Sequence, residues 1–196
     1  MSSSLDLPRH DLMAVSRASL ATLRSALVRD NGPTAAAALQ EAGFAGGAAA
    51  FDAFRAWLRA RGEADPGDLD LADFQREAAD FFHETGWGSI QIGSLHDAVA
   101  VVDSSDWSEA SPGEHLEHPG CHYSTGMLAY FFGQFADGAL GALEVECRSA
   151  GAARCRFLLG NTDVMQYLFA ALERGEAYDA AAIRIGAEGL PQGQPF

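Results

Sequence analysis

Three cysteines carry most of the chemistry that this sequence offers. Cys147 and Cys155 flank a predicted tight turn at residues 149–151, so their sulfur atoms can come close together. Cys121 follows a Pro-Gly pair at the predicted start of a helix, where the helix dipole and free backbone N–H groups favour a thiolate. Three thiolates form a strong set of soft ligands, and zinc takes four ligands at a tetrahedral site. The cysteines therefore indicate a candidate metal centre.

A fourth ligand could come from Glu144 or Glu146, which stand beside Cys147. In a regular strand Glu144 and Cys147 point to opposite faces, so the use of Glu144 requires a bulge or a twisted strand end. The spacing contains no Cys-x-x-Cys pair, and two other interpretations stay open. The cysteines could be three separate buried core thiols, or one of them could be a nucleophile paired with a histidine of residues 115–122.

Aromatic side chains are frequent in the segments around the candidate metal centre, and they could line a small-molecule pocket or simply fill the core. Trp107 lies in a polar loop between Asp106 and Ser108, where a core residue is not expected. His83, near the end of a predicted helix, is a candidate polar contact or else a solvated capping residue. The candidate ligand-binding residues are Trp107, His83, Phe82, Trp87, Tyr123 and Phe131.

Composition narrows the class of protein. The 196 residues include 27 acidic and 13 basic side chains, a net charge of −14, and every basic residue is arginine. Such a surface repels phosphates, which argues against direct binding of nucleic acid or of anionic lipid. The sequence has no apolar run long enough to span a membrane and no secretory signal, so we expect a cytoplasmic protein. In that compartment an odd number of cysteines argues against a disulfide framework.

The elements that position these residues fall into two predicted parts. Residues 9–85 are predicted to be helical, with helices at 9–29, 33–42, 48–61 and 71–84, and with Gly43, Gly46 and Gly47 interrupting the chain between the second and third. Asp70 is a predicted N-cap. Residues 1–8 are expected to be a disordered N-terminus, and residues 186–196 a flexible tail.

Residues 86–185 form the second predicted part. Strands are predicted near residues 90–93, 99–102, 140–147, 155–159 and 181–185, and helices at 121–135 and 162–174. The helix at 121–135 is apolar on most faces, which is typical of a helix inside a protein. We therefore expect an α+β fold, in which N-terminal helices precede an antiparallel sheet packed on this buried helix.

A family resemblance rests on four segments near the cysteines. Residues 121–126 (CHYSTG), 133–135 (GQF), 144–151 (EVECRSAG) and 154–157 (RCRF) resemble the signature of the 4-vinyl reductase domain family. That family includes a bacteriochlorophyll-biosynthesis protein, stand-alone hydrocarbon-binding proteins and the sensor domains of aromatic-responsive transcription activators. Vesicle-tethering subunits share the fold. It is a ligand-binding fold that also occurs in proteins of nitric-oxide signalling and Golgi transport.

The resemblance implies a zinc site. In the aromatic sensors three cysteines and one glutamate hold zinc, and their spacing falls here on Cys121, Glu144, Cys147 and Cys155. Four protein ligands leave no open position for water, so such a site is structural. The run at residues 107–110 also resembles a sensor segment in which a tryptophan donates its indole N–H to a phenol.

The function implied is that of a stand-alone intracellular sensor. It would bind a small hydrophobic or aromatic molecule, contain a structural zinc, form a homodimer and act on a protein effector. One alternative is an enzyme or auxiliary of (bacterio)chlorophyll vinyl reduction, and another is a scaffold subunit with a lipid-filled pocket. The sequence lacks a dinucleotide-binding glycine pattern, a P-loop and iron–sulfur spacing, so we expect no catalysis of its own.

Overall fold

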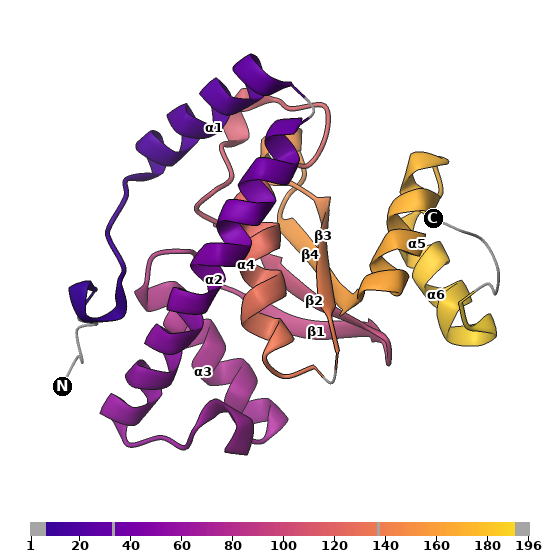
Figure 1. Cartoon of the computed structure of the whole chain (residues 1–196). Coiled ribbons are helices and arrows are strands. Elements are labelled where there is room, and N and C mark those ends of the chain that lie inside the picture. Colours follow the sequence, from indigo (N-terminus) through magenta and orange to yellow (C-terminus); the bar gives the residue numbers. More distant parts are fainter. Residues whose placement is uncertain (1–6, 33, 137, 191–196) are drawn as a thin grey trace.

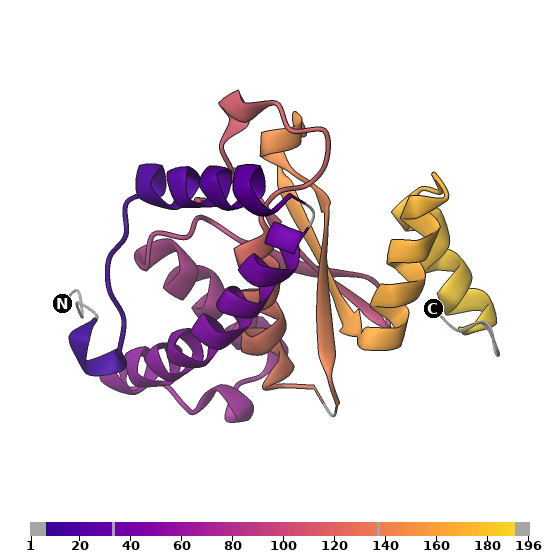
Figure 2. The same cartoon turned by 45° about the horizontal axis from the view of Figure 1, so that its top comes forward.

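A four-stranded antiparallel sheet separates two groups of helices (Figures 1 and 2). The computed structural model describes residues 7–32, 34–136 and 138–190. The strands occur in the order β1-β2-β4-β3. They are β1 (Gln91–His96), β2 (Val99–Ser104), β3 (Leu140–Glu146) and β4 (Cys155–Asn161). This arrangement confirms the predicted α+β fold.

The helices cover both faces of the sheet. On one face lie α2 (Thr34–Arg61), α3 (Leu71–Glu84) and α4 (His122–Gly133). On the other face lie α5 (Thr162–Glu173) and α6 (Tyr178–Glu188). The remaining helix, α1 (Arg17–Asn31), lies beside the start of α2, away from the sheet (Figure 1). Among the described residues no helix is long and apolar enough to cross a bilayer.

Side-chain alternation along the central strands explains why two cores form. Val102 and Phe157 face the core under α2, α3 and α4, whereas Val101 and Leu158 face the core under α5 and α6. Successive side chains of a strand point to opposite faces, so apolar residues at every position bury both faces of the sheet. The helix α4 has eight of its residues buried, which confirms the predicted internal helix.

The predicted break between two N-terminal helices is wrong. One helix, α2, runs without interruption through Gly43, Gly46 and Gly47. A Cβ atom on Gly47 would lie 2.6 Å from the Tyr130 Cβ and 2.9 Å from the Met127 carbonyl oxygen. These glycines therefore let the backbones of α2 and α4 approach closely. A mid-helix glycine costs about 1 kcal/mol relative to alanine, and the close packing offsets this cost.

Two other element boundaries differ from expectation. The first helix begins at Arg17, not at residue 9, because the Ser16 side chain caps it by accepting from the Ser19 N–H at 3.1 Å. The strand predicted at 181–185 is part of α6, because Ala181, Ala182 and Ile185 bury one helical face. Short apolar runs do not distinguish a strand from a helix. Residues 186–188 of the expected tail complete α6, while residues 1–6 and 191–196 lie outside the described residues.

Candidate metal centre and the adjoining aromatic interior

Cys121, Glu144, Cys147 and Cys155 converge on one buried point. The Cys121 sulfur lies 3.8 Å from that of Cys147 and 3.9 Å from that of Cys155. One ligand atom from each of the four residues lies within 4.8 Å of the others. A tetrahedral metal with bonds of about 2.3 Å to sulfur separates its sulfurs by about 3.8 Å. The cluster therefore has the dimensions of a four-coordinate metal site and could hold a metal ion.

A bulge in β3 brings Glu144 and Cys147 to the same face. Glu144 pairs with Phe157 and Glu146 pairs with Arg156, so Val145 is an extra residue in β3. Val145 and Glu146 consequently both face the α5 and α6 side of the sheet, and Glu144 and Cys147 face α4. For Glu144 to face the cysteines, the sequence required a bulge or a twisted strand end, and the bulge is present. It turns the other candidate, Glu146, away from the cluster.

The electrostatics of Glu144 favour a cation at this point. Its Oε2 atom accepts a hydrogen bond from the Cys121 N–H at 2.7 Å, but its buried Oε1 atom has no hydrogen-bond partner among the described residues. Burial and, to a smaller extent, the charge of the neighbouring Cys147 raise the pKa of Glu144 to about 9. An unpartnered buried carboxyl oxygen is costly. A divalent ion would supply the missing partner and stabilise the ionised carboxylate.

Without a metal, the three thiols differ in the direction in which their surroundings shift their pKa values. Hydrogen bonds donated by Cys121 and Cys155 lower the pKa of Cys147, whereas donation to Cys147 raises the pKa of Cys121. Soft thiolates with one carboxylate suit a borderline-soft divalent ion, which allows all of its ligands to ionise. The residues present fit such an ion.

Five of the candidate ligand-binding residues form one aromatic group beside the metal centre. Trp107 is only 1% exposed and contacts Phe82 and Trp87, with ring centroids 6.0 and 5.6 Å apart. Trp87 stacks on Tyr123 at 5.9 Å, and Phe82 contacts Phe131 at 4.9 Å. The group joins α3, the loop before α4, and α4 itself.

His83 lies apart from this aromatic group. It is exposed at the end of α3, and its Nδ1 atom lies 3.3 Å from the Ser89 hydroxyl. The structure therefore places this candidate residue on the surface, because α3 turns its apolar face, with Phe81 and Phe82, toward the core. Its exposed position agrees with the second interpretation given above, a solvated residue at the helix end.

A buried polar chain crosses the aromatic group, and the sequence did not reveal its central members. The Trp107 indole N–H donates to the Ser124 hydroxyl at 2.7 Å, and that hydroxyl donates to Glu109. Glu109 also accepts from the backbone N–H groups of Tyr123 at 3.1 Å and Ser124 at 2.8 Å, which caps the start of α4. Burial raises the pKa of Glu109, although these hydrogen bonds oppose the effect.

Arg24 ties α1 to the same loop. Its side chain, on an otherwise exposed helix, is buried; its Nη1 atom donates to the Glu109 carbonyl oxygen at 2.7 Å. Its Nη2 atom forms an ion pair with Glu114. In the sequence Arg24 resembles any solvated arginine of a surface helix, since its partners lie 85 and 90 residues away.

A second feature of this side is a groove between α2, α4 and β3. It has a volume of about 380 Å³ and opens to solvent. Small residues form much of its lining. The lining residues are Gln40, Glu41, Phe44, Thr125, Gly126, Ala129 and Ala142.

The family comparison covers the segment that contains the metal centre. Residues 108–161 match the family model of the 4-vinyl reductase domain. This match confirms the resemblance that the sequence motifs suggested, and it includes all four candidate metal ligands. No curated protein matches the chain.

Solved structures with the same fold cover most of the chain. The phenol-responsive sensory domain of the transcription activator PoxR, solved with phenol, has a TM-score of 0.60 and 16% identity, covering 92% of this chain and 85% of that chain. A vinyl-4-reductase family protein from Methanocaldococcus jannaschii has a TM-score of 0.50 and 15% identity, covering 78% and 88%. Trafficking protein particle complex subunit 3 from Naegleria fowleri, covalently bound to palmitic acid, has a TM-score of 0.56 and 10% identity, covering 74% and 91%. At these identities the likeness shows the fold.

Proposed function

We propose that this chain is a small-molecule sensor domain braced by a structural zinc ion. The observation that carries the proposal is the convergence of Cys121, Glu144, Cys147 and Cys155 at the start of α4, next to the aromatic group. Zinc suits three thiolates and one carboxylate in tetrahedral geometry, and four protein ligands leave no position for a reacting water. The ion would fix the start of α4 against β3 and β4.

The ligand would be a small aromatic molecule that carries a hydroxyl group. Trp107, Ser124 and Glu109 are the polar groups of an otherwise apolar interior, and they satisfy one another. A ligand hydroxyl could accept from the Trp107 N–H and donate to the Glu109 carboxylate, which replaces both hydrogen bonds of Ser124. The phenol carried by one of the structural neighbours has such a hydroxyl. Entry of the ligand requires the loop that Arg24 holds to move.

Phenol itself is the probe that tests this ligand class. We expect calorimetry to detect phenol binding to the zinc-loaded chain and to show its loss in Trp107→Phe. The matched control is Trp57→Phe, because Trp57 is also buried, but its indole N–H donates to Glu84 at 3.0 Å, outside this interior. Equal binding by both variants, or no binding by the unaltered chain, would contradict the proposed aromatic ligand.

A lipid-type ligand is the second candidate, favoured by the groove beside α2 and α4. One structural neighbour is covalently bound to palmitic acid. All three cysteines of this chain lie in the metal cluster, so none remains to form a thioester, and an acyl chain would bind without a covalent bond. Palmitic acid in the same calorimetric experiment separates this candidate from phenol. Competition between palmitic acid and phenol would place both in one site.

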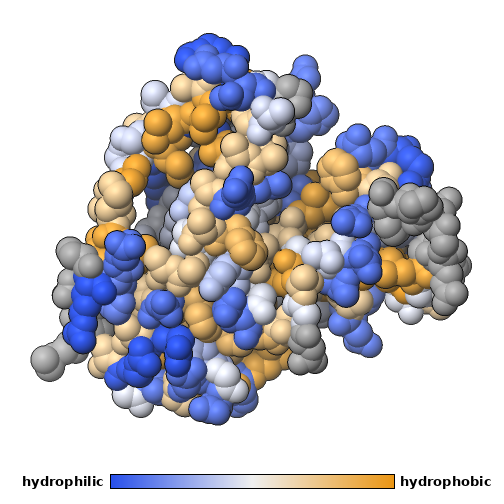
Figure 3. Space-filling view, viewed as in Figure 1, coloured by the Kyte–Doolittle hydropathy of each residue, from blue (hydrophilic) through white to orange (hydrophobic). Residues whose placement is uncertain are grey.

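The proposed partners are a second copy of the chain and a protein effector. Leu23 and Val28 of α1 are 59% and 47% exposed, and Figure 3 shows apolar side chains gathered over this helix. Contiguous exposed apolar surface marks sites of protein association. We place the protein in the cytoplasm, where thiolate ligands stay reduced.

A further inference from the structure

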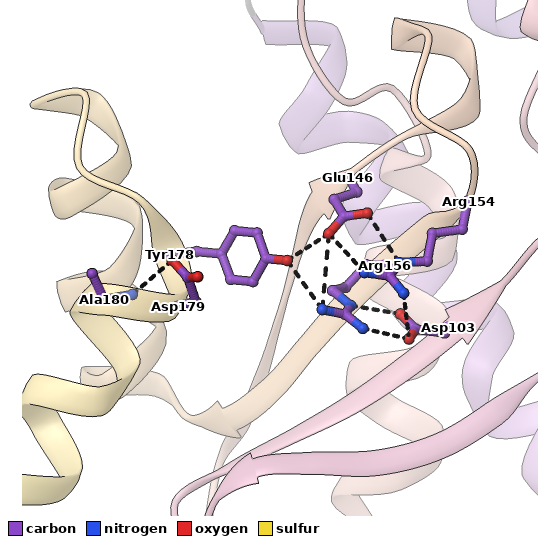
Figure 4. A network of polar contacts seen from close by, with 7 residues as sticks. All are labelled: Asp103, Glu146, Arg154, Arg156, Tyr178, Asp179 and Ala180. Atoms are coloured by element: carbon purple, nitrogen blue, oxygen red, sulfur yellow. Dashed lines mark hydrogen bonds and ion pairs between the residues drawn. The ribbon is translucent and has the colours of Figure 1, made fainter.

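Glu146 and Arg156 belong to a charged network on the face of the sheet opposite the metal centre (Figure 4). Arg156 forms two hydrogen bonds with Asp103, at 2.7 and 2.6 Å, which join β4 to β2. Arg154 forms two hydrogen bonds with Glu146, at 3.0 and 3.1 Å. They join the end of β3 to the residue before β4, across the turn of the β3–β4 hairpin. Paired hydrogen bonds of this kind fix the orientation of both partners.

One tyrosine connects this network to α6. The Tyr178 hydroxyl donates to Glu146 at 2.5 Å and accepts from Arg156 at 3.0 Å. Tyr178 is the first residue of α6, and the N-cap residue Ala177 provides no side-chain hydrogen bond. Otherwise α6 is held against the sheet by apolar contacts of Ala181, Ala182 and Ile185. Tyr178 is therefore a polar link between the start of α6 and the hairpin.

The network and the metal ligands alternate along the same two segments. Glu146 immediately precedes Cys147, and Arg154 and Arg156 flank Cys155. The β3 bulge produces this alternation, because it turns Glu146 to one face while it keeps Glu144 and Cys147 on the other. A bulge disrupts the regular ladder, so its conformation depends on side-chain contacts more than that of an ordinary strand.

We infer that this network positions Glu144, Cys147 and Cys155 for metal binding and couples the metal centre to the docking of α6. The inference rests on the proposed metal centre and adds a role for residues that do not touch the ion. The charged network holds the bulge from one face of the sheet, and the ion would hold it from the other. Each then favours the same strand conformation, so each stabilises the other. Energetic coupling between two sites is reciprocal.

The test uses the full chain, stripped of metal, with cobalt(II) alone as the probe. Cobalt–thiolate absorption reports both the affinity and the ligand set. Tyr178→Phe removes the link to α6, and Glu146→Gln weakens the pairing with Arg154. We expect each to reduce cobalt affinity about 10-fold, as outer contacts of metal sites commonly do. The matched control is Tyr167→Phe, because the Tyr167 hydroxyl accepts from Arg184 at 2.9 Å, a hydrogen bond within the α5–α6 pair that involves no residue of the charged network. The cobalt affinity of Tyr167→Phe should equal that of the unaltered chain.

Hydrogen exchange supplies the reciprocal measurement. In the unaltered chain, cobalt should increase the protection of α6 amides, and this increase should be lost in Tyr178→Phe and kept in Tyr167→Phe. Equal cobalt affinities for the unaltered chain and Tyr178→Phe would overturn the inference and leave the metal centre intact. Equal losses in Tyr178→Phe and Tyr167→Phe would also overturn it, since they would show only general destabilisation. An unaltered chain that binds no cobalt would overturn the metal centre and the coupling together.

Discussion

The carboxyl group of Glu144 is buried beside three sulfurs, and in the described part of the chain one of its oxygens has no hydrogen-bond partner. Desolvation alone makes such a group a liability, and its pKa of about 9 reflects that. The same group becomes favourable when it binds a divalent ion together with the thiolates, because the ion offsets part of their negative charge. The stability of the chain should therefore depend on the ion.

Replacing one sulfur ligand tests this dependence. We expect Cys155→Ser to lose bound metal and at least about 4 kcal/mol of unfolding free energy, a part of the roughly 10–16 kcal/mol that structural zinc can supply. Chemical denaturation and metal analysis would measure both effects. A chelator should bring the unaltered chain to the stability of the variant, while the exposed-site control Glu63→Gln should match the unaltered chain. A metal-free variant of full stability would exclude a structural role for the ion.

Glu109 should make the stability of the chain depend on pH. Burial raises its pKa above the usual 4.5, so between those two values the folded chain binds more protons than the unfolded chain. The contribution of Glu109 to the unfolding free energy therefore falls as pH rises through this window. A rise of one pKa unit corresponds to about 1.4 kcal/mol.

Glu109→Gln keeps an acceptor at the start of α4 and removes the titration. We expect the variant to gain stability relative to the unaltered chain as pH rises from about 4 through the raised pKa of Glu109, because only the unaltered chain then loses its bound proton. Urea denaturation across this range measures the difference, and both proteins share the metal centre, so its own pH dependence cancels. The control is Glu63→Gln, an exposed site. If the difference in unfolding free energy between Glu109→Gln and the unaltered chain did not change with pH, as expected for Glu63→Gln, the effect assigned to the burial of Glu109 would be contradicted.

Individual residues differed in how well the sequence revealed them. The three cysteines could be singled out by their residue type, whereas the choice of Glu144 as the fourth candidate ligand came from the family resemblance. Glu109 and Arg24 could not be assigned their contacts, because those contacts depend on which distant segments meet in space. The sequence left two interpretations of His83 open, and its position depends on which face α3 turns toward the core: the structure places it among the exposed residues at the end of that helix.

The close packing of α2 on α4 depends on glycine. A Cβ on Gly126 would overlap the backbone carbonyl of Gln40, whereas a Cβ on Gly46 would meet only the end of the Tyr123 side chain. We expect Gly126→Ala to lower the unfolding free energy by about 3 kcal/mol, at the upper end of overpacking effects. Gly46→Ala should cost much less, because a side-chain end can move and alanine favours the helix by about 1 kcal/mol. Thermal denaturation measures the stability of the two variants. Equal losses in Gly126→Ala and Gly46→Ala would contradict the close contact between Gly126 and the Gln40 backbone.

Elements with a clear local signal could be predicted well. Helix α3 begins after the predicted N-cap Asp70, whose side chain accepts from Asp73 N–H at 2.8 Å, and the internal helix α4 followed from its apolar composition. The continuity of α2 could not be predicted, because glycine breaks an isolated helix but serves a helix–helix contact. The helical state of α6 was missed, because its short apolar run also fits a strand.

At the level of the whole molecule, α1 lies outside the three layers that the sheet and its two groups of helices form. Its buried Arg24 binds the loop over the aromatic interior, and Leu23 and Val28 of the same helix are exposed to solvent. A second copy that covers Leu23 and Val28 would connect ligand entry in one subunit with contacts between subunits. The arrangement gives the proposed sensor a route for output.

Charge placed on α1 tests the proposed dimer. We expect Leu23→Glu to weaken self-association at least about 10-fold, because it would bury a charge in the apolar contact. Leu71→Glu is the matched control, since Leu71 is 70% exposed at the start of α3, far from α1 in Figure 1. Sedimentation velocity over a range of concentrations would measure both. A monomeric unaltered chain, or equal behaviour of the two variants, would contradict the use of α1.

The most direct test of the account is the metal content of the chain, purified under reducing conditions without chelator and measured by elemental mass spectrometry. The account predicts one zinc per chain, which remains through gel filtration and is absent from Cys155→Ser. A freshly purified chain that contains no metal and gains no stability when zinc is added would contradict it.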